Sequence, residues 1–313
     1  MTIHDINRLL ARAINVCPNL GSELESGYTI ELTAHEFDLF QQAGFCAVRL
    51  GVYWAAHCGD APEFRIVPKA LDRVHTYLDL AAERDLAVVL TNFLDPDLIA
   101  NPPQHLPRLL SITDQVATAF ADRPQSVVLE PFTEPRDALD PLWNDTLREL
   151  LTVIRKTDTE RAVVFGPGAY NNIRMLPQLA LPDDPNLIVT IHQYWPITFT
   201  MQGEEWLGAD TPFGEPRSWL GTTWTGTDQQ RGELAAGYEG WPPGPKPTSA
   251  PSSSANSAPP PKPTLPAAPA GPSSTGARPK NTGSPGAAGL SRPPSPSTTS
   301  NPRAGISHCC AHS

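Results

Sequence analysis

The residues best suited to chemistry lie in the stretch VVLEPFTEP (127–135), where two glutamates are each followed by proline. The apolar β-branched residues before them predict a strand, and a strand that ends in carboxylates is well placed for general acid–base work. Glu134 is therefore a candidate acid/base, with an ordinary solvated loop glutamate as the alternative. Glu130 shares its face only if the strand stays extended through Pro131; otherwise it is a paired structural carboxylate.

Five further apolar runs also lead to polar side chains. Each run is rich in Val, Ile or Leu without strict alternation, as expected for strands covered on both faces. With the run above, the predicted strands span residues 13–20, 47–52, 86–93, 126–132, 162–168 and 186–194. The polar residues that collect toward their carboxyl ends are Asn19, Arg49, Asn92, Glu134, His192 and Tyr194.

Amphipathic stretches separate these runs. They predict helices over residues 33–44, 67–85, 106–122 and 141–158, and a shorter helix over 172–180. Thr33 and Glu36 form a capping-box pattern at the start of the first helix, and Gly44 ends it. Pro141 suits the first turn of the fourth helix. Strands that alternate with helices in this way predict a parallel α/β sheet with right-handed crossovers.

Two α/β folds fit this order, an open doubly wound sheet and a (β/α)8 TIM barrel. The sequence contains neither a G-x-G-x-x-G stretch after the first strand nor a Walker-type phosphate loop. Polar residues at many strand ends favour the barrel, whose site is assembled from many strands, over a sheet with one switch point. The predicted fold is thus of the TIM-barrel class, with about six β/α units.

Residues 241–313 differ sharply from the rest of the chain. They contain no Asp, Glu, Val or Phe but 18 of the 36 prolines. Such a segment buries too little apolar surface to offset its ordering entropy, so it is predicted to be a disordered tail after a folded domain in residues 1–240. That domain carries all 33 acidic and 17 of the 23 basic side chains, a formal charge of −16.

Composition excludes several classes of function. An acidic domain argues against nucleic acid as a partner, since phosphate binding uses a basic face. No run approaches the roughly 18 apolar residues of a membrane span. No secretory signal precedes the first strand, so the chain as written would be cytoplasmic, while the sequence leaves the compartment open. The five cysteines lack metal-ligand spacing and predict free thiols, and neither a metal nor a cofactor is expected.

Four longer stretches, taken in order, match the pattern of one known family. They are NLGSELES (19–26), AGFCAVRLGVYWAAH (43–57), VVLEPFTEP with the later LWNDTLRELLTVIRKTDTERAVVFGPGAYN (127–171), and LPDDPNLIVTIHQYWPITFTMQGEEW (181–206). Together they resemble glycoside hydrolase family 5, the cellulase-like family, over roughly residues 13–228. The resemblance implies a TIM barrel that hydrolyses O-glycosidic bonds of an oligo- or polysaccharide such as β-glucan.

The resemblance also implies roles for individual residues. Glu134 would be the acid/base that protonates the glycosidic oxygen. Arg49 would hold the nucleophilic carboxylate in its ionised form, a task suited to a permanent cation, with a structural salt bridge as the alternative. His192 and Tyr194 would line the cleft from the sixth strand. Trp195 would stack on a sugar ring, although core or rim packing stays open for it.

Three polar positions of the family pattern are exchanged in this sequence. Thr133 precedes Glu134 where the family has an asparagine that binds the sugar 2-hydroxyl, and a threonine cannot offer the same donor geometry. Phe93 and Leu94 replace a His pair at the third strand, and Met201 replaces a His after the sixth. Thr133 is still counted among the substrate-binding residues. The exchanges indicate a shifted substrate or a weakened site.

The partner carboxylate is the missing element. A retaining glycosidase needs a second carboxylate about 5–5.5 Å from the first, which the family carries on its seventh strand in Gly-Glu-Phe-Gly. No such motif follows the sixth strand, and Glu215 in FGEP lies in a loop. The sequence therefore predicts a chain truncated or frameshifted before the seventh strand, without its nucleophile. The loss of every acidic residue after 240 favours a shifted reading frame over a genuine Pro/Ser linker.

Two functions therefore remain open. The first is a retaining hydrolase of β-glucan or related oligosaccharides with Glu134 as acid/base. The second is a catalytically inactive, truncated carbohydrate-binding or vestigial protein. Both have an oligo- or polysaccharide as the expected partner, with no nucleic acid and no membrane.

Overall fold

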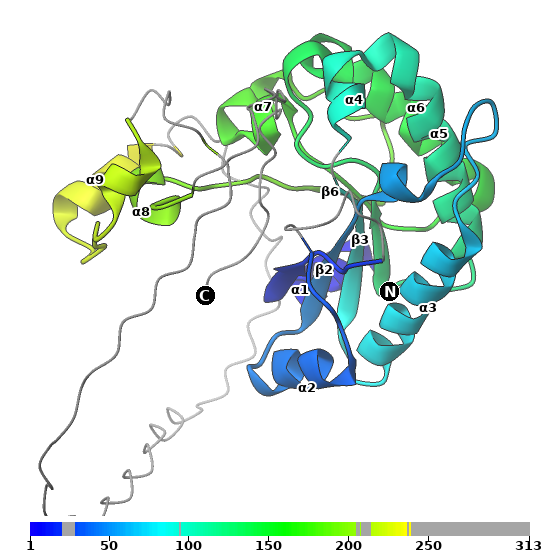
Figure 1. The fold of residues 1–313 in the computed structure, drawn as a ribbon, viewed down its shortest axis with the longest axis horizontal. Coiled ribbons are helices and arrows are strands. Elements are labelled where there is room, and N and C mark those ends of the chain that lie inside the picture. Colours follow the sequence, from blue (N-terminus) through cyan, green and yellow to red (C-terminus); the bar gives the residue numbers. More distant parts are fainter. Residues whose placement is uncertain (21–28, 94, 205–206, 208–213, 237, 239–313) are drawn as a thin grey trace, which may run out of the picture. The chain divides into compact units, whose positions relative to one another are not determined.

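The structure is a computed structural model, and it describes residues 1–20, 29–93, 95–204, 207, 214–236 and 238. The predicted disordered tail, residues 241–313, lies outside the described residues, as does Leu94. The described part is built on one six-stranded parallel sheet in the order β1-β2-β3-β4-β5-β6 (Figure 1). Its strands are β1 (Ala13–Val16), β2 (Ala47–Val52), β3 (Ala87–Asn92), β4 (Val127–Glu130), β5 (Val163–Phe165) and β6 (Leu187–Val189).

The predicted parallel α/β fold with six units is confirmed by this sheet. Each strand pairs with the next one in the sequence, as in Arg49 opposite Val89 and Val163 opposite Leu187. Every predicted strand is present; the second has the predicted bounds, and the other five are shorter than expected: the first ends at Val16 rather than at residue 20, and the fourth at Glu130 rather than at 132. Apolar residues that follow a strand continue into buried loops, so hydrophobicity alone overestimates strand length.

Side chains alternate between the two faces of this curved sheet. Leu50, Leu90 and Leu129 belong to the large cluster that packs against the outer helices. The intervening residues Val89 and Val128 form a second cluster on the inner face. This alternation places Arg49, Thr91 and Glu130 on the inner face as well, because residues two apart on a strand point the same way. The inner face therefore carries apolar residues at one end and polar residues at the other.

Helices cover the outer face of the sheet. They are α2 (Ala34–Gln42), α3 (Pro68–Ala82), the short α4 (Pro96–Ala100), α5 (Pro102–Ala119) and α6 (Trp143–Thr157). The predicted capping box at Thr33 and Glu36 is present, and Gly44 beyond α2 has a φ of +82°. The prediction that Pro141 opens the fourth helix is wrong. Pro141 lies in the 3-10 helix η3 (Asp137–Leu142), and α6 starts only at Trp143.

Further helical elements complete the described chain. They are η2 (Trp54–His57), α7 (Gly168–Asn171), η4 (Ile173–Gln178), α8 (Ile197–Thr200), η6 (Pro216–Trp219) and α9 (Asp228–Ala236). The helix predicted over residues 172–180 is thus a 3-10 helix with Pro177 inside it. Proline lacks the amide donor that a longer α-helical run would need at this point.

The amino-terminal helix α1 (Ile3–Leu9) was not predicted from the sequence. Thr2 and Asp5 close its first turn with a reciprocal capping box. Its Ile6 is buried against Val89 and Val128 of the inner cluster. Helix α1 therefore covers the apolar end of the inner face. It carries too few apolar residues in seven positions to show helical periodicity, and its stability comes from this packing.

The two outermost strands are the least buried. All residues of β3, β4 and β5 are buried, whereas only Val16 is buried in β1 and no residue is buried in β6. Val189 in β6 is 41% exposed. Among the residues that the structure describes, no strand pairs with the outer side of β1 or of β6. The described sheet is thus an open barrel wall with two free edges.

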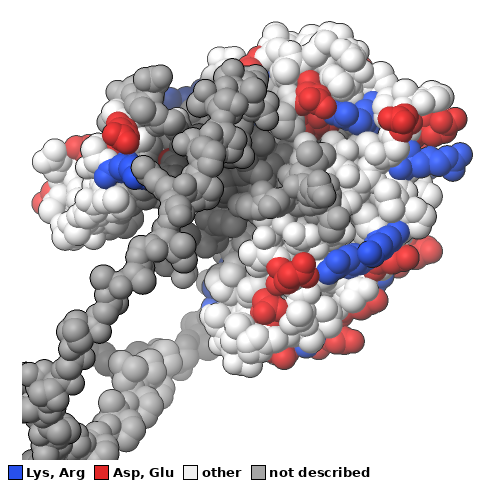
Figure 2. All heavy atoms as spheres, viewed as in Figure 1, with Lys and Arg blue, Asp and Glu red and all other residues white. Residues whose placement is uncertain are grey.

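Charged side chains on the outer helices pair with one another. Arg84 bonds Asp38 at 2.7 Å, and Arg73 bonds Glu31 at 3.1 Å. On the face drawn in Figure 2, acidic and basic side chains are interspersed over the helices. A solvent-exposed pair such as Arg73–Glu31 contributes at most about 1 kcal/mol, so such pairs are not what holds the fold together.

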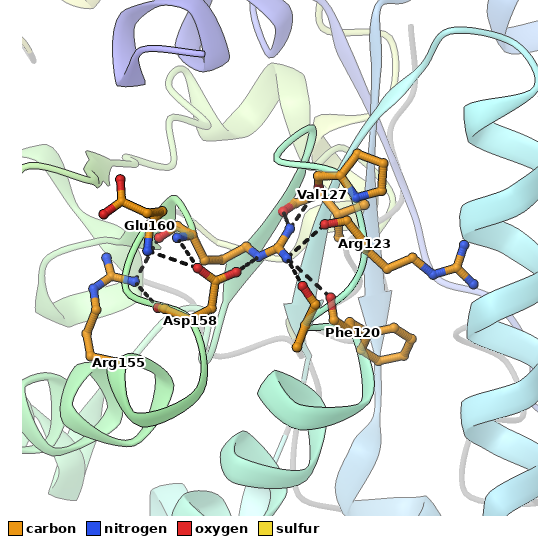
Figure 3. A network of polar contacts seen from close by, with 9 residues as sticks. Phe120, Arg123, Val127, Arg155, Asp158 and Glu160 are labelled. Atoms are coloured by element: carbon orange, nitrogen blue, oxygen red, sulfur yellow. Dashed lines mark hydrogen bonds and ion pairs between the residues drawn. The ribbon is translucent and has the colours of Figure 1, made fainter.

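Arg161 is the exception, a buried arginine at the amino ends of β4 and β5. Its side chain bonds Asp158 at 3.0 Å and is 2% exposed. Its other guanidinium nitrogens donate to five backbone carbonyls, those of Phe120, Ala121, Arg123, Pro124 and Val127 (Figure 3). Arg161 thus ties the end of α5 to the start of β4, where a helix leaves its last carbonyls without partners.

Replacing Arg161 with methionine is expected to lower the free energy of unfolding by about 3–5 kcal/mol, because the buried contacts of its guanidinium with Asp158 and five backbone carbonyls are lost together. Arg161→Lys should also destabilise, since an ammonium offers three donors instead of a five-donor fork. Urea unfolding of the full chain measures the effect, with the exposed Arg174→Met as control. A loss below about 1 kcal/mol for Arg161→Met would contradict this role.

Candidate active site

Glu130 and Arg49 form the buried centre of the polar end of the inner face. The Arg49 Nε and Nη2 atoms donate to the two Glu130 oxygens at 2.7 and 2.8 Å. Thr91 on β3 donates its hydroxyl to Glu130 Oε2 at 2.8 Å. Glu130 is 1% exposed, so the pair is a two-pronged, charge-assisted contact shielded from water. Glu130 is thus the paired carboxylate that the sequence left as an alternative.

The charge on Glu130 is set by these partners. Burial by itself raises the pKa of Glu130, but the Arg49 guanidinium, with smaller contributions from His192 and Thr91, outweighs burial and holds that pKa below its ordinary value. A buried carboxylate whose two oxygens both accept hydrogen bonds from a cation stays ionised, but neither oxygen is available to another group. Glu130 is therefore a fixed negative charge at the base of the site rather than a group that reacts.

Arg49 also reaches the residue before Glu134. Its Nη2 donates to the Thr133 hydroxyl at 2.7 Å, and Thr133 is 4% exposed. The structure thus brings together Arg49 on β2 and Thr133 after β4. Contact of either residue with a sugar is not tested by the structure and remains a prediction.

Glu134 lies beyond the strand rather than at its end, which corrects the expected position. Strand β4 stops at Glu130, and Glu134 follows with a φ of +52°. A left-handed conformation is uncommon for a residue with a side chain, and residues strained in this way cluster at functional sites. Its carboxylate Oε1 lies 2.7 Å from Nδ1 of His192. The turn therefore points Glu134 at the residue that follows β6.

His192 is positioned by the segment after β5. Its backbone N–H donates to the Asn171 carbonyl at 2.9 Å, and Asn172 and His192 form an isolated parallel bridge. Its ring Nε2 lies 3.3 Å from the Asn171 side-chain Nδ2. The imidazole thus sits between a carboxylate on one side and an amide on the other. The structure thus places Glu134 and His192 in direct contact; their roles as acid/base and as substrate-binding residue stay predictions.

Asn171 is a residue of the site that the sequence did not reveal. It closes a turn in which Ala169, Tyr170 and Asn171 have φ values of +50°, +66° and +56°. Three consecutive left-handed residues are unusual, because each non-glycine residue there costs roughly 1 kcal/mol or more. The signal in the sequence is Gly166, since a Cβ there would lie 2.4 Å from the Asn171 amide.

Aromatic side chains line the exposed rim beside His192. Tyr194 and Trp195 are 37% and 44% exposed, and the Tyr194 ring meets the His192 ring edge to face at 6.4 Å. Tyr170 is 47% exposed, with the Arg136 guanidinium 4.9 Å from its ring centre. Partial burial raises the pKa of Tyr170, although Arg136 acts in the opposite direction. Exposed aromatic faces next to an acid/base can stack on sugar rings.

Phe93, which replaces a family histidine after the third strand, has apolar surroundings in the structure. Phe93 is 4% exposed and packs with Cys17 and the partly buried Tyr53 on the inner face. Gly51 leaves room for this cluster, since a Cβ there would lie 3.0 Å from Cys17 Sγ and 3.3 Å from Phe93 Cβ. Asn92 does not join the site; it lines a small cavity with Trp54 and Thr113 on the helix side of the sheet.

The polar groups of the site can be compared with the ligand sets of metal centres. Among the residues that the structure describes, no three metal-ligating side chains come together. None of the described helices is long and apolar enough to cross a membrane. The assembled groups are therefore a buried Arg–Glu pair, a carboxylate–imidazole–amide chain and an aromatic rim, which suit acid–base chemistry on a polar ring-shaped ligand.

Comparison with known proteins identifies the family to which these groups belong. Residues 20–233 match the family model Cellulase (glycosyl hydrolase family 5). Endoglucanase H of Acetivibrio thermocellus is 29% identical over 204 residues, 64% of this chain and 22% of that protein. Endoglucanase A of Ruminococcus albus is 27% identical over 205 residues, 58% of this chain and 56% of that protein. The chain thus spans about a fifth and just over half of these two relatives.

Solved structures show the same fold. The Thermotoga maritima endoglucanase Cel5A in complex with cellobiose superimposes with a TM-score of 0.68 at 31% identity, covering 75% of this chain and 74% of that one. A hyperthermophilic endo-β-1,4-glucanase in complex with substrate gives a TM-score of 0.68 at 30% identity. The TIM-barrel class predicted from the sequence is therefore correct. Since the family model covers more than half of the residues, this chain belongs to glycosyl hydrolase family 5.

Proposed function

We propose that this chain is an endoglucanase-like hydrolase of β-1,4-linked glucans that uses Glu134 as its general acid/base. The observation that carries the proposal is the contact between Glu134 and His192 beside an exposed aromatic rim. Relatives with a solved structure are described as endo-β-1,4-glucanases and as complexes with cellobiose, which supports a glucan as substrate. Residues 1–240 would form the catalytic domain.

The proposed reaction is a retaining double displacement. Glu134 would give its proton to the leaving glycosidic oxygen and, as a carboxylate, later take a proton from the attacking water. Arg49 would act at the base of the site, and Tyr194 and Trp195 would hold the sugar ring. The first step also needs a second carboxylate that attacks the anomeric carbon.

No nucleophile is assigned among the described residues. Glu130 is excluded from that role because Arg49 and Thr91 occupy its oxygens in a buried pocket. Glu215 is exposed at the start of η6, outside the carboxylate–imidazole–amide chain. This gap supports a second candidate, a protein that binds carbohydrate through Tyr170, Tyr194 and Trp195 without cleaving it.

One pair of measurements on the purified full chain separates the two candidates. Reducing ends released from a soluble β-1,4-glucan report hydrolysis, and calorimetry with cello-oligosaccharides reports binding. Release above the level of a Glu134→Gln sample supports the hydrolase. Binding with release at that background level would replace the hydrolase with the binding protein. If the chain neither binds cello-oligosaccharides nor releases reducing ends, both candidates are contradicted.

A further inference from the structure

The side chain of Asn171 is buried and contacts His192, the residue that contacts Glu134. It is 1% exposed, and its Nδ2 lies 3.3 Å from Nε2 of His192. Its Oδ1 atom has no hydrogen-bond partner among the described residues. Among the described residues, the side chain of Asn171 thus makes its polar contact with His192. Which of the two groups donates the hydrogen bond determines which ring nitrogen of His192 carries a proton.

An amide nitrogen can only donate a hydrogen bond. In the orientation that the structure gives this amide, Nε2 of His192 therefore carries a lone pair rather than a proton, and the single proton of a neutral ring lies on Nδ1. That Nδ1–H donates to Glu134 Oε1 at 2.7 Å. Asn171 and Glu134 thus select the same tautomer from opposite sides of the ring.

This arrangement determines where an additional proton goes. If Nε2 took up that proton, two donors would face each other across 3.3 Å in a buried site, which is unfavourable. Glu134 Oε1 already accepts from Nδ1–H, so the remaining place is Glu134 Oε2. A proton on Oε2 is the one that a general acid can transfer to a leaving oxygen.

We propose that Asn171 is a positioning residue that keeps protons off Nε2 of His192 and thereby holds the transferable proton on Oε2 of Glu134. The inference rests on the proposed function of Glu134 as acid/base and extends it by one residue. Asn171 touches neither substrate nor the reacting atoms and acts through the imidazole.

The backbone is built to hold Asn171 in this place. The left-handed turn at residues 169–171 turns the Asn171 amide back onto Gly166, where a Cβ would lie 2.4 Å from it. The Asn171 carbonyl accepts from the His192 backbone N–H at 2.9 Å. Asparagine and aspartate are the side chains that tolerate this conformation best. The same residue therefore fixes both the position of His192 and the face that its ring presents.

Other charged and titratable groups also face the imidazole. Glu134 contacts Nδ1 from the loop after β4, and the Tyr194 ring packs edge to face at 6.4 Å. Glu130 on β4 interacts electrostatically with His192, but the Arg49 guanidinium pairs with Glu130 directly. The groups next to the two ring nitrogens are thus one carboxylate and one amide.

The experiment reads the tautomer directly and does not depend on catalysis. Two-bond 1H–15N correlation spectra of the uniformly labelled full chain at pH 7 report which ring nitrogens carry protons, and a His192→Gln sample assigns the signals. In the native protein we expect a proton on Nδ1 and none on Nε2. A native signal with Nε2 protonated would overturn the proposal whether or not the chain hydrolyses glucan.

Asn171→Asp supplies the matched variant, because aspartate keeps the shape and tolerates the left-handed turn but can only accept. We expect His192 to carry protons on both ring nitrogens at pH 7 in this variant, since carboxylates then flank the ring on both sides. Asn172→Asp adds the same charge one residue away, on an exposed side chain that faces solvent, and should leave the native tautomer in place. If the two ring nitrogens of His192 keep their native protonation in Asn171→Asp, the proposal is also overturned.

Discussion

Glutamine in place of Glu134 is expected to lower the rate of β-1,4-glucan hydrolysis by a factor of about 10²–10⁴. Glutamine keeps an oxygen for the 2.7 Å contact with His192 but cannot supply a proton to the leaving oxygen. The free energy of unfolding should therefore change little. Initial rates of reducing-end release from the native chain and from Glu134→Gln, at equal protein concentration, measure the loss.

A change of leaving group tests whether the lost function is proton donation. An aryl glycoside with a strongly acidic phenol leaves without protonation, so Glu134→Gln should slow its cleavage far less than it slows cleavage of the glucan. Glu149→Gln makes the same chemical change on the exposed side of α6 and should leave both rates at the native level. Equal losses on both substrates would assign Glu134 to sugar binding or to folding instead.

Glu130→Gln is expected to destabilise the fold by about 3–5 kcal/mol, since it removes the carboxylate that two Arg49 nitrogens and the Thr91 hydroxyl bind in a buried pocket. The Arg49 side chain is 13% exposed and that of Glu130 1%, so water cannot replace the lost partner. Urea unfolding measures the change. An effect below about 1 kcal/mol would show that the pair is not a structural element.

Acidity gives the same pair a second test. The folded pKa of Glu130 lies below its ordinary value of 4.5 because the Arg49 charge outweighs the opposing effect of burial. The carboxylate therefore contributes stability at pH values above 4.5, and that contribution is lost as the pH falls through the folded pKa. The difference in unfolding free energy between the native chain and Glu130→Gln should shrink on acidification below pH 4.5.

A double variant separates the charge pair from packing. Replacing both partners with apolar residues, as in Arg49→Met with Glu130→Leu, removes both charges of the buried pair instead of one. The double variant should therefore be more stable than Glu130→Gln alone, with a favourable coupling between the two sites. Strictly additive losses would mean that the two side chains act independently.

Local patterns predicted the scaffold well. The apolar runs became β1 to β6, the capping box at Thr33 starts α2, and Gly44 ends it with a positive φ. Helix α1 was missed because seven residues are too few to show a periodic pattern, and the start of α6 was misplaced by two residues. These properties depend on neighbours within a few positions, which is why the sequence carries them and why errors concentrate at element ends.

The site was predicted only in part. Glu134 and His192 were chosen from their motifs, and they do meet, although they are 58 residues apart in the chain. The role of Glu130 stayed open, because its pairing with Arg49 spans 81 residues. Asn171 was not found, since its importance comes from a left-handed turn that places it against an imidazole from another segment.

The sequence by itself therefore determined the family, the order of strands and helices, and the glutamate that is the candidate acid. These follow from hydrophobic period, turn residues and motif spacing, all of which are local. Only the tertiary structure decided that Glu130 is held by buried partners and that Glu134 contacts His192. These roles depend on the partners that folding brings to each carboxylate oxygen. Arg49 and Thr91 bind Glu130, and Asn171 and His192 orient Glu134, through contacts between segments that no local pattern encodes.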